Sequence, residues 1–138
     1  MSDALEKIVT FINEHHVMSL ATMDENELSV CSLFYAYDRE TNSFVVASDD
    51  KTMHIQHIKE NKNIAGNILL ETKTVGKIQG LQFKGKFYPL ENKLLKECYF
   101  KNFPYARALF PKLWEIRIES FKMSDNRLGF GKKIIWEM

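Results

Sequence analysis

The segment SDDKT, which begins at Ser48, concentrates hydroxyls, carboxylates and an ammonium group within five residues. Backbone amides at a helix start, the hydroxyls of Ser48 and Thr52 and the Lys51 ammonium could together bind an anion such as phosphate. The alternative is a plain helix cap, in which Asp49 or Asp50 accepts the first helical amides and Lys51 is solvated. Residue spacing by itself leaves these two interpretations even.

Four histidines are the other candidates for chemistry. His54 and His57 stand three residues apart and could share a helix face as metal ligands, but no suitable third ligand is near in sequence and no HExxH pattern occurs. Hydrogen-bonded or solvated histidines are therefore favoured, and no metal site is predicted. His15 and His16 close the first expected helix, where an imidazolium complements the helix dipole.

Composition narrows the function classes. The 138 residues are 45% hydrophobic and 27% charged with a net charge of +1, which is typical of a soluble globular protein. A nucleic-acid partner is not expected, because the chain has no dense basic block. No apolar run approaches the roughly 18 residues of a membrane span. Cys31 and Cys98 fit no metal or redox spacing, so we expect reduced thiols and a cytoplasmic location. The chain length is typical of a single domain, which we expect over residues 1–138.

Apolar periodicity predicts the elements that must position these residues. Helical spacing predicts helices over residues 3–13, 52–59 and 91–103, and a short helix opening at Pro104. Alternation predicts strands over residues 17–23, 28–37, 43–48, 64–71, 74–90 and 113–119, and a closing hairpin of 121–125 with 128–136. Antiparallel neighbours joined by short turns favour an α+β barrel over a βαβ fold.

Three glycines, Gly76, Gly80 and Gly85, interrupt the long predicted strand 74–90. Glycines within a strand usually mark bulges or bends, which is how a sheet curls into a barrel. Around them, apolar Leu81, Phe83 and Phe87 share one parity, whereas polar Gln82, Lys84 and Lys86 share the other. One face of this strand is therefore expected to be buried and the other exposed.

Several stretches together resemble a known family. FVVASDDKTMHIQHI, then NIAGNI and GLQFKGKF, are similar to the FMN-binding split-barrel superfamily of pyridoxamine 5'-phosphate oxidase-like proteins. The ending WEIRIESFKMSDNRLGFGKKIIW is closer still to its small bacterial YhbP-like subfamily. The resemblance covers nearly the whole chain. It implies an α+β, mostly β fold: a six- to seven-stranded antiparallel split barrel of Greek-key type with about three flanking helices.

The resemblance also implies FMN as the cofactor and a set of residues that bind it. These residues are Ser32, Leu33, Phe34, Ser48, Lys51, Thr52, Gln82, Lys132 and Trp136. The first three would follow the isoalloxazine ring, mainly through backbone, and the next three would hold the phosphate. Gln82 would meet the polar edge of the ring, and the last two would approach from a partner subunit. No catalytic residue is assigned.

The chain departs from true pyridoxamine phosphate oxidases. Its early strand SVCSLFY has no arginine, its loop has a single lysine, and their C-terminal arginine-and-histidine substrate motif is absent. Pyridoxamine phosphate is therefore not the expected substrate. The first functional hypothesis is an FMN-dependent oxidoreductase acting on a small molecule, with reduced nicotinamide as one electron donor to consider. A flavin carrier or redox sensor, and a haem-binding split barrel, are the alternatives.

A homodimer with the flavin site at its interface is also expected. The chain has more aromatic residues than so small a barrel should enclose, and an extensive wet apolar patch is unfavourable. The residues on which this expectation rests are Phe34, Phe83, Phe100, Phe103 and Phe110. Family resemblance points the same way, because related proteins build the flavin slot between two subunits.

Overall fold

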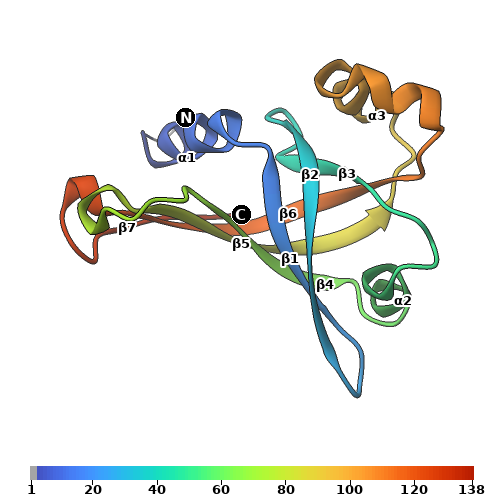
Figure 1. Cartoon of the computed structure of the whole chain (residues 1–138), viewed down its shortest axis with the longest axis horizontal. Helices are drawn as coiled ribbons and strands as arrows, with labels where there is room; N and C mark the ends of the chain where they lie inside the picture. The colour runs from blue at the N-terminus through green and yellow to red at the C-terminus, as the bar shows by residue number, and fades with distance from the viewer. Residues whose placement is uncertain (1–2) are drawn as a thin grey trace.

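The computed structural model describes residues 3–138 and contains one antiparallel sheet that closes into a barrel (Figure 1). The first two residues of the predicted domain lie outside this range. The strands are β1 (Val17–Met23), β2 (Leu28–Asp38), β3 (Ser43–Ala47), β4 (Asn63–Leu69), β5 (Gln79–Pro89), β6 (Leu113–Asp125) and β7 (Lys133–Glu137). Their order is β3-β2-β1-β4-β5-β6-β7, and an additional pairing of β3 with β6 closes the first six strands. The predicted α+β split barrel is confirmed.

Three α-helices flank the barrel. They are α1 (Asp3–Glu14), α2 (Met53–Glu60) and α3 (Lys93–Asn102), and three short 3-10 helices are η1 (Val75–Lys77), η2 (Pro104–Leu109) and η3 (Asn126–Leu128). α1 packs against β7, α2 against β1 and β2, and α3 against β2 and β3. None of the helices within residues 3–138 is long and apolar enough to cross a membrane.

The barrel interior is filled by inward-facing aromatic and aliphatic side chains. Phe44 lies at its centre, with ring centroids 5.1 Å from Tyr35, 5.0 Å from Phe83 and 6.5 Å from Phe121. Leu81, Phe83 and Phe87 of β5 are buried, whereas Gln82 and Lys84 are exposed. The parity predicted for this strand is therefore confirmed.

The structure merges two predicted strands, 113–119 and 121–125, into the single strand β6. Core residues occupy even positions at Trp114, Ile116 and Ile118, but odd positions at Phe121 and Met123. This change of parity is why alternation predicted a break. A β-bulge explains it, because one extra residue in β6 turns every later side chain to the opposite face.

The bulge lies opposite Gly85 of β5. Lys84 pairs with Ser120 but Gly85 pairs with Ile118, so Glu119 is the extra residue. A Cβ atom on Gly85 would lie 2.2 Å from the carbonyl oxygen of Arg117, a distance that no side chain tolerates. The bulge that the glycine pattern predicted is confirmed at this position.

Two predicted strand boundaries are wrong. Residues 75–77 form η1 instead of the start of the long strand, because the Lys77 amide bonds the Thr74 carbonyl (2.9 Å) and turns the chain before Gln79. At the C-terminus, β7 begins only at Lys133. Gly129 and Gly131 precede it with φ angles of 126° and 77°, which are incompatible with an extended strand.

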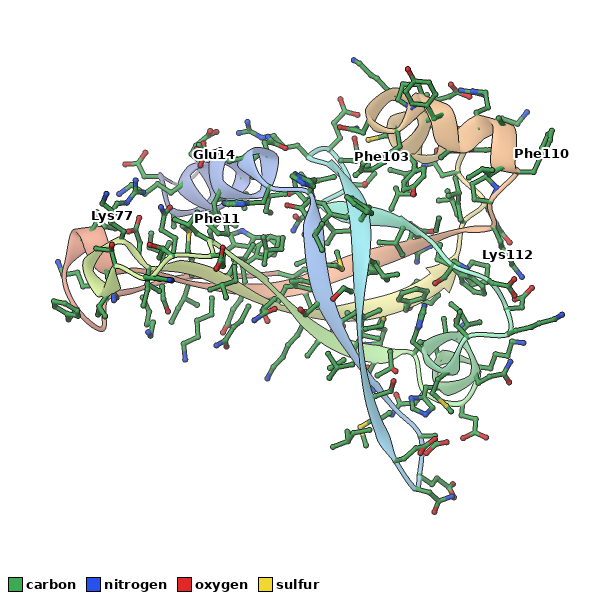
Figure 2. The ribbon with its side chains drawn as sticks, in the orientation of Figure 1. Phe11, Glu14, Lys77, Phe103, Phe110 and Lys112 are labelled. Atoms are coloured by element: carbon green, nitrogen blue, oxygen red, sulfur yellow. The ribbon has the colours of Figure 1, made fainter. Side chains whose placement is uncertain are left out.

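The aromatic surplus that predicted a dimer is smaller than expected. Phe83 lies in the barrel core, and Phe100 lies on the buried face of α3 in a second apolar cluster with Ala36 and Val45, so for these two residues the prediction is wrong. Phe103 is partly buried against Tyr99, with ring centroids 5.0 Å apart. Phe34 and Phe110 remain exposed, at 54% and 90%, and Figure 2 shows Phe110 at the outer surface beyond α3.

The bulge predicts a large difference between two glycine substitutions. Gly85→Ala should lower the free energy of unfolding by about 3 kcal/mol, because the added Cβ collides with backbone rather than with a flexible side chain. Gly76→Ala is the matched control, since a Cβ there meets nothing within 4 Å among the described residues, and it should change stability by less than about 0.5 kcal/mol. Urea unfolding of both variants measures the difference. Equal stabilities would contradict the close backbone approach at Gly85.

Candidate functional site

The loop between β3 and α2 leaves the start of α2 without a side-chain cap. Thr52 is the N-cap residue, and within residues 3–138 its side chain makes no capping hydrogen bond. Its hydroxyl instead donates to the carbonyl of Asp49 (2.9 Å). The first amides of α2, beginning at Met53, therefore lack the side-chain acceptor that usually satisfies a helix start.

Neither aspartate of the loop caps α2, which contradicts the plain-cap interpretation. Asp49 Oδ1 accepts the amide of Lys51 (2.8 Å). Asp50 pairs with Lys112 Nζ (2.8 Å), which lies beside the loop in Figure 2. The hydrogen bond from Lys112 lowers the pKa of the Asp50 carboxyl below its usual range. Asp50 is thus neutralised by Lys112, whereas the Asp49 carboxylate stays within the loop, bonded to the Lys51 amide, and neither carboxylate caps α2.

Ser48 is held from three directions. Its amide donates to the Lys112 carbonyl (3.0 Å), and its carbonyl accepts the indole N–H of Trp114 (2.9 Å). Its hydroxyl hydrogen-bonds Nε2 of His54. Sequence reasoning assigned no role to Trp114, which has no local signature because only the β3–β6 pairing brings it to the loop. The hydrogen-bonded histidine that the sequence favoured at position 54 is confirmed, although its partner Ser48 was not predicted.

A hollow on the protein surface adjoins the loop. It has a volume of about 530 Å³ and is lined by Asp50, Ile58, Lys59, Lys62, Phe87, Pro89, Lys112 and Trp114. Its three lysines outnumber its single carboxylate, and Lys112 Nζ lies 4.7 Å from the centre of the Trp114 ring. Lysine side chains therefore give this side of the loop an excess of positive charge.

Gln82 lies elsewhere, in a groove of about 610 Å³ on the outer face of the sheet. Cross-strand pairing aligns it in one row formed by Ser32, Ser19, Asn67, Gln82, Lys122 and Ile135. Ser32 and Gln82 are three strand spacings apart, or roughly 14 Å. Gly66 lies in the groove wall, where a Cβ would clash with the Phe83 ring (2.4 Å). Polar side chains therefore line this groove, and one part of its wall is packed too tightly to accept a side chain at Gly66.

The predicted site residues do not all meet within one chain. Ser48, Lys51 and Thr52 are absent from the lining of the Gln82 groove in the described part of the protein. Lys132 is exposed in the β6–β7 connection, in a different region from the loop. Within one chain, the loop residues and Gln82 therefore belong to separate regions.

The remaining predicted residues have mixed orientations. Leu33 and Trp136 pack against the barrel core, and the Trp136 ring lies 5.7 Å from that of Phe121. Phe34 points outward and stacks on His16, with centroids 5.9 Å apart and planes at 8°. Of the β2 residues, Ser32 and Phe34 therefore present side chains outward, whereas Leu33 could contact a ligand only through its backbone.

The two cysteines are unpaired and half-buried. Burial raises the pKa of both Cys31 and Cys98, so neither is an activated thiolate.

Comparison with known proteins identifies the family. No family model matches the chain. A UPF0306 protein YhbP from Escherichia fergusonii is 37% identical over 137 residues, which cover 97% of this chain and 93% of that protein. A UPF0306 protein YhbP from Escherichia coli is 36% identical over 138 residues, covering 98% and 99%. The chain belongs to the UPF0306 (YhbP) family. The subfamily that the C-terminal segment resembled is confirmed.

Solved structures share the fold of this UPF0306 chain. A heme binding protein from Mycobacterium smegmatis superposes with a TM-score of 0.81 at 14% identity, over 99% of this chain and 59% of that one. A FAD-binding protein from Mesorhizobium loti gives 0.73 at 15% identity, over 89% and 92%. A NimC/NimA family protein from Clostridium acetobutylicum gives 0.74 at 12%, over 98% and 92%. At these identities the likeness establishes the split barrel alone.

The surroundings of His54 predict a pH dependence of stability. Burial, followed by repulsion from His57, lowers the pKa of His54 below its ordinary 6.5. Below pH 6.5 the unfolded chain binds a proton that the folded chain resists, so the free energy of unfolding should fall as pH decreases from 7.5 to 5.5. Carboxyls with lowered pKa, such as those of Asp50 and Asp125, titrate below 3.8 and do not contribute in this window.

His54→Gln removes the titrating group while keeping a polar partner for Ser48. Urea unfolding at both pH values should show a smaller loss of stability in this variant than in the wild type. An identical loss in both proteins would mean that His54 is not the group that resists protonation.

Proposed function

We propose that this protein binds FMN and is a flavin-dependent oxidoreductase acting on a small molecule. The observation that carries the proposal is the uncapped start of α2, with Lys51 beside it, Asp50 paired with Lys112, and Asp49 bonded to the Lys51 amide instead of capping the helix. This arrangement lies where the sequence resemblance expects the flavin phosphate. Fold neighbours that include a FAD-binding protein support a flavin in general terms.

The β3–α2 loop suits a phosphate monoester. Uncapped helix amides direct donors and the positive end of the helix dipole toward an anion. In the proposed complex, the Ser48 hydroxyl and the Lys51 ammonium add donors, and Trp114 and His54 hold Ser48 in place. The Thr52 hydroxyl would add a third donor by exchanging its bond to the Asp49 carbonyl for one to the phosphate. A rigid loop reduces the entropy lost on binding, so the affinity for the phosphate depends on these supporting contacts as well as on the donors.

The outer groove suits the ring system. Its volume of about 610 Å³ lies within the roughly 300–1,000 Å³ typical of cofactor sites. Val30 and Ile135 provide apolar surface, while the amides of Asn67 and Gln82 provide donors and acceptors for a polar edge. FMN, when bound, supplies the electron chemistry through its isoalloxazine ring. The role of the chain is to bind the ring, orient it through Gln82 and exclude water.

We infer that a homodimer completes the site. Loop and groove are separate within one chain, so in this proposal the loop of one protomer faces the groove of its partner. Lys132 would then approach the cofactor from the partner side, whereas the Trp136 side chain packs against Phe121 and could contribute only through its backbone. Exposed apolar residues on the outer face of the sheet support an interface there, with Val30 72%, Phe34 54% and Ile135 58% exposed.

Haem is the second candidate ligand, because a heme binding protein shares the fold with a TM-score of 0.81. His54 and His57 are buried and each contacts a hydroxyl, which makes them poor axial ligands without rearrangement. His15 and His16 line a hollow of about 330 Å³ together with Tyr35 and Phe103, and they are the histidines that a haem could reach.

A flavin carrier or redox sensor is the other alternative. Measuring turnover with reduced nicotinamide as the electron donor separates an oxidoreductase from either of these.

The phosphate assignment predicts a ligand-specific effect of Lys51→Ala. FMN affinity should fall about tenfold or more, because a charge-assisted contact contributes roughly 1.5–3 kcal/mol. Riboflavin, which lacks the phosphate, should bind wild type and variant alike. Flavin-fluorescence titrations measure both ligands. Lys101→Ala on α3 is the matched lysine control, and Gln82→Ala should weaken both flavins. Equal effects of Lys51→Ala on FMN and riboflavin would refute the assignment.

The proposed interface predicts that the protein is a dimer at micromolar concentration. Light scattering should report twice the chain mass, and Val30→Glu should shift the mass toward that of one chain by placing a charge on the outer face. Leu94→Glu is the control, since Leu94 is 79% exposed on α3, and it should leave the mass unchanged. A wild-type monomer, or equal masses for all three proteins, would contradict the interface.

A further inference from the structure

The turn between β1 and β2 brings two carboxylates to a buried histidine of α2. Nε2 of His57 lies 3.5 Å from Glu27 Oε1 and 3.8 Å from Asp24 Oδ2. One ligand atom from each of the three side chains falls within 4.8 Å of the other two. Figure 1 shows this turn projecting beyond the barrel on the side of α2.

The imidazole of His57 is the unusual member of this cluster. Its side chain is only 1% exposed. Nδ1 lies 2.9 Å from the Thr22 hydroxyl, but Nε2 has no hydrogen-bond partner among residues 3–138. Buried polar atoms are rarely left without a partner. The carboxylate oxygens are the atoms that Nε2 faces, yet both lie beyond the roughly 3.2 Å limit of a good hydrogen bond.

We propose that His57, Asp24 and Glu27 bind a divalent metal ion, for which zinc is the best match. One imidazole and two carboxylates form a ligand set that zinc accepts, and three protein ligands leave a fourth position open. Metal–ligand bonds of roughly 2.0–2.2 Å in a tetrahedral site place neighbouring ligand atoms about 3.3–3.6 Å apart. The separations of 3.5 and 3.8 Å from Nε2 are close to this range, and the two carboxylate oxygens, which lie within 4.8 Å of each other, would draw together on the ion.

Surrounding contacts orient each ligand. When Nε2 is a ligand, Nδ1 keeps the proton and its N–H donates a hydrogen bond to the Thr22 hydroxyl, which fixes the ring as outer-shell partners do in metal sites. Asp24 Oδ1 accepts the amides of Asn26 and Glu27 at 2.8 Å each, so that Oδ2 is the oxygen available to the ion. The Glu27 side chain is 55% exposed, which gives the ion a path from solvent.

The ion would fasten the β1–β2 turn to α2. His57 follows His54 by three residues on this helix, and His54 hydrogen-bonds Ser48 of the β3–α2 loop. The site is separate from the flavin proposal, because its ligands belong neither to the loop nor to the Gln82 groove. Sequence reasoning predicted no metal site because Asp24 and Glu27 lie thirty residues and more before His57, beyond any local spacing pattern.

Isothermal titration of the metal-stripped full-length protein with zinc chloride tests the proposal. The wild type should bind one zinc ion per chain. Glu27→Gln keeps the size of an exposed side chain and should weaken zinc binding at least tenfold, since even outer-shell losses cost about 10–100-fold. Glu25→Gln, an exposed position in the same turn, is the matched control and should bind like the wild type.

A second readout separates binding at this cluster from zinc held by other histidines. Cobalt(II) should give the intense visible bands of a low-coordinate site in wild type and Glu25→Gln, and these bands should be lost in Glu27→Gln. Absence of stoichiometric zinc binding by a folded wild type would overturn the proposal. Equal zinc affinity and equal cobalt spectra in wild type and Glu27→Gln would overturn it as well, leaving only a charged cluster.

Discussion

The pairing of β3 with β6 is the constraint on which the rest of the structure depends. It closes six strands into a barrel and sets Val46 opposite Trp114. The Trp114 indole then reaches the Ser48 carbonyl, and Lys112 reaches Asp50. A long-range backbone pairing thus fixes the loop that begins α2. Without that closure Asp50 would lose its partner Lys112 and Ser48 its partner Trp114, whereas Asp49 and Thr52 make their contacts within the loop itself.

The bulge at Glu119 lets one strand serve two purposes. Before it, β6 pairs with β3 and turns Trp114 and Ile116 inward; after it, β6 pairs with β7 and turns Phe121 inward. The extra residue keeps the apolar side chains on the core side along the whole curved strand. Lys122 consequently faces outward beside Gln82, where the groove forms. Gly85 permits this arrangement because only a residue without a Cβ fits against the Arg117 carbonyl.

Local patterns were sufficient for most of the fold but not for the sites. Alternation placed β1 and the buried face of β5 correctly, because side-chain parity is a local property of a strand. It divided β6 in two, because a bulge reverses parity without ending the strand. The partners of the loop were not predictable in this way: Asp50 meets Lys112 sixty-two residues later, and His57 meets Glu27 thirty residues earlier. Such contacts depend on closure of the barrel and have no signature in sequence spacing.

The central proposal is that this split barrel binds a flavin in preference to a haem. The most direct test incubates the purified protein with equal excesses of FMN and haemin, removes unbound ligand by desalting, and records the absorption spectrum. The account predicts that the two visible bands of an oxidised flavin remain with the protein in about one equivalent per chain. A retained Soret band without flavin bands, or a spectrum with neither ligand, would contradict it.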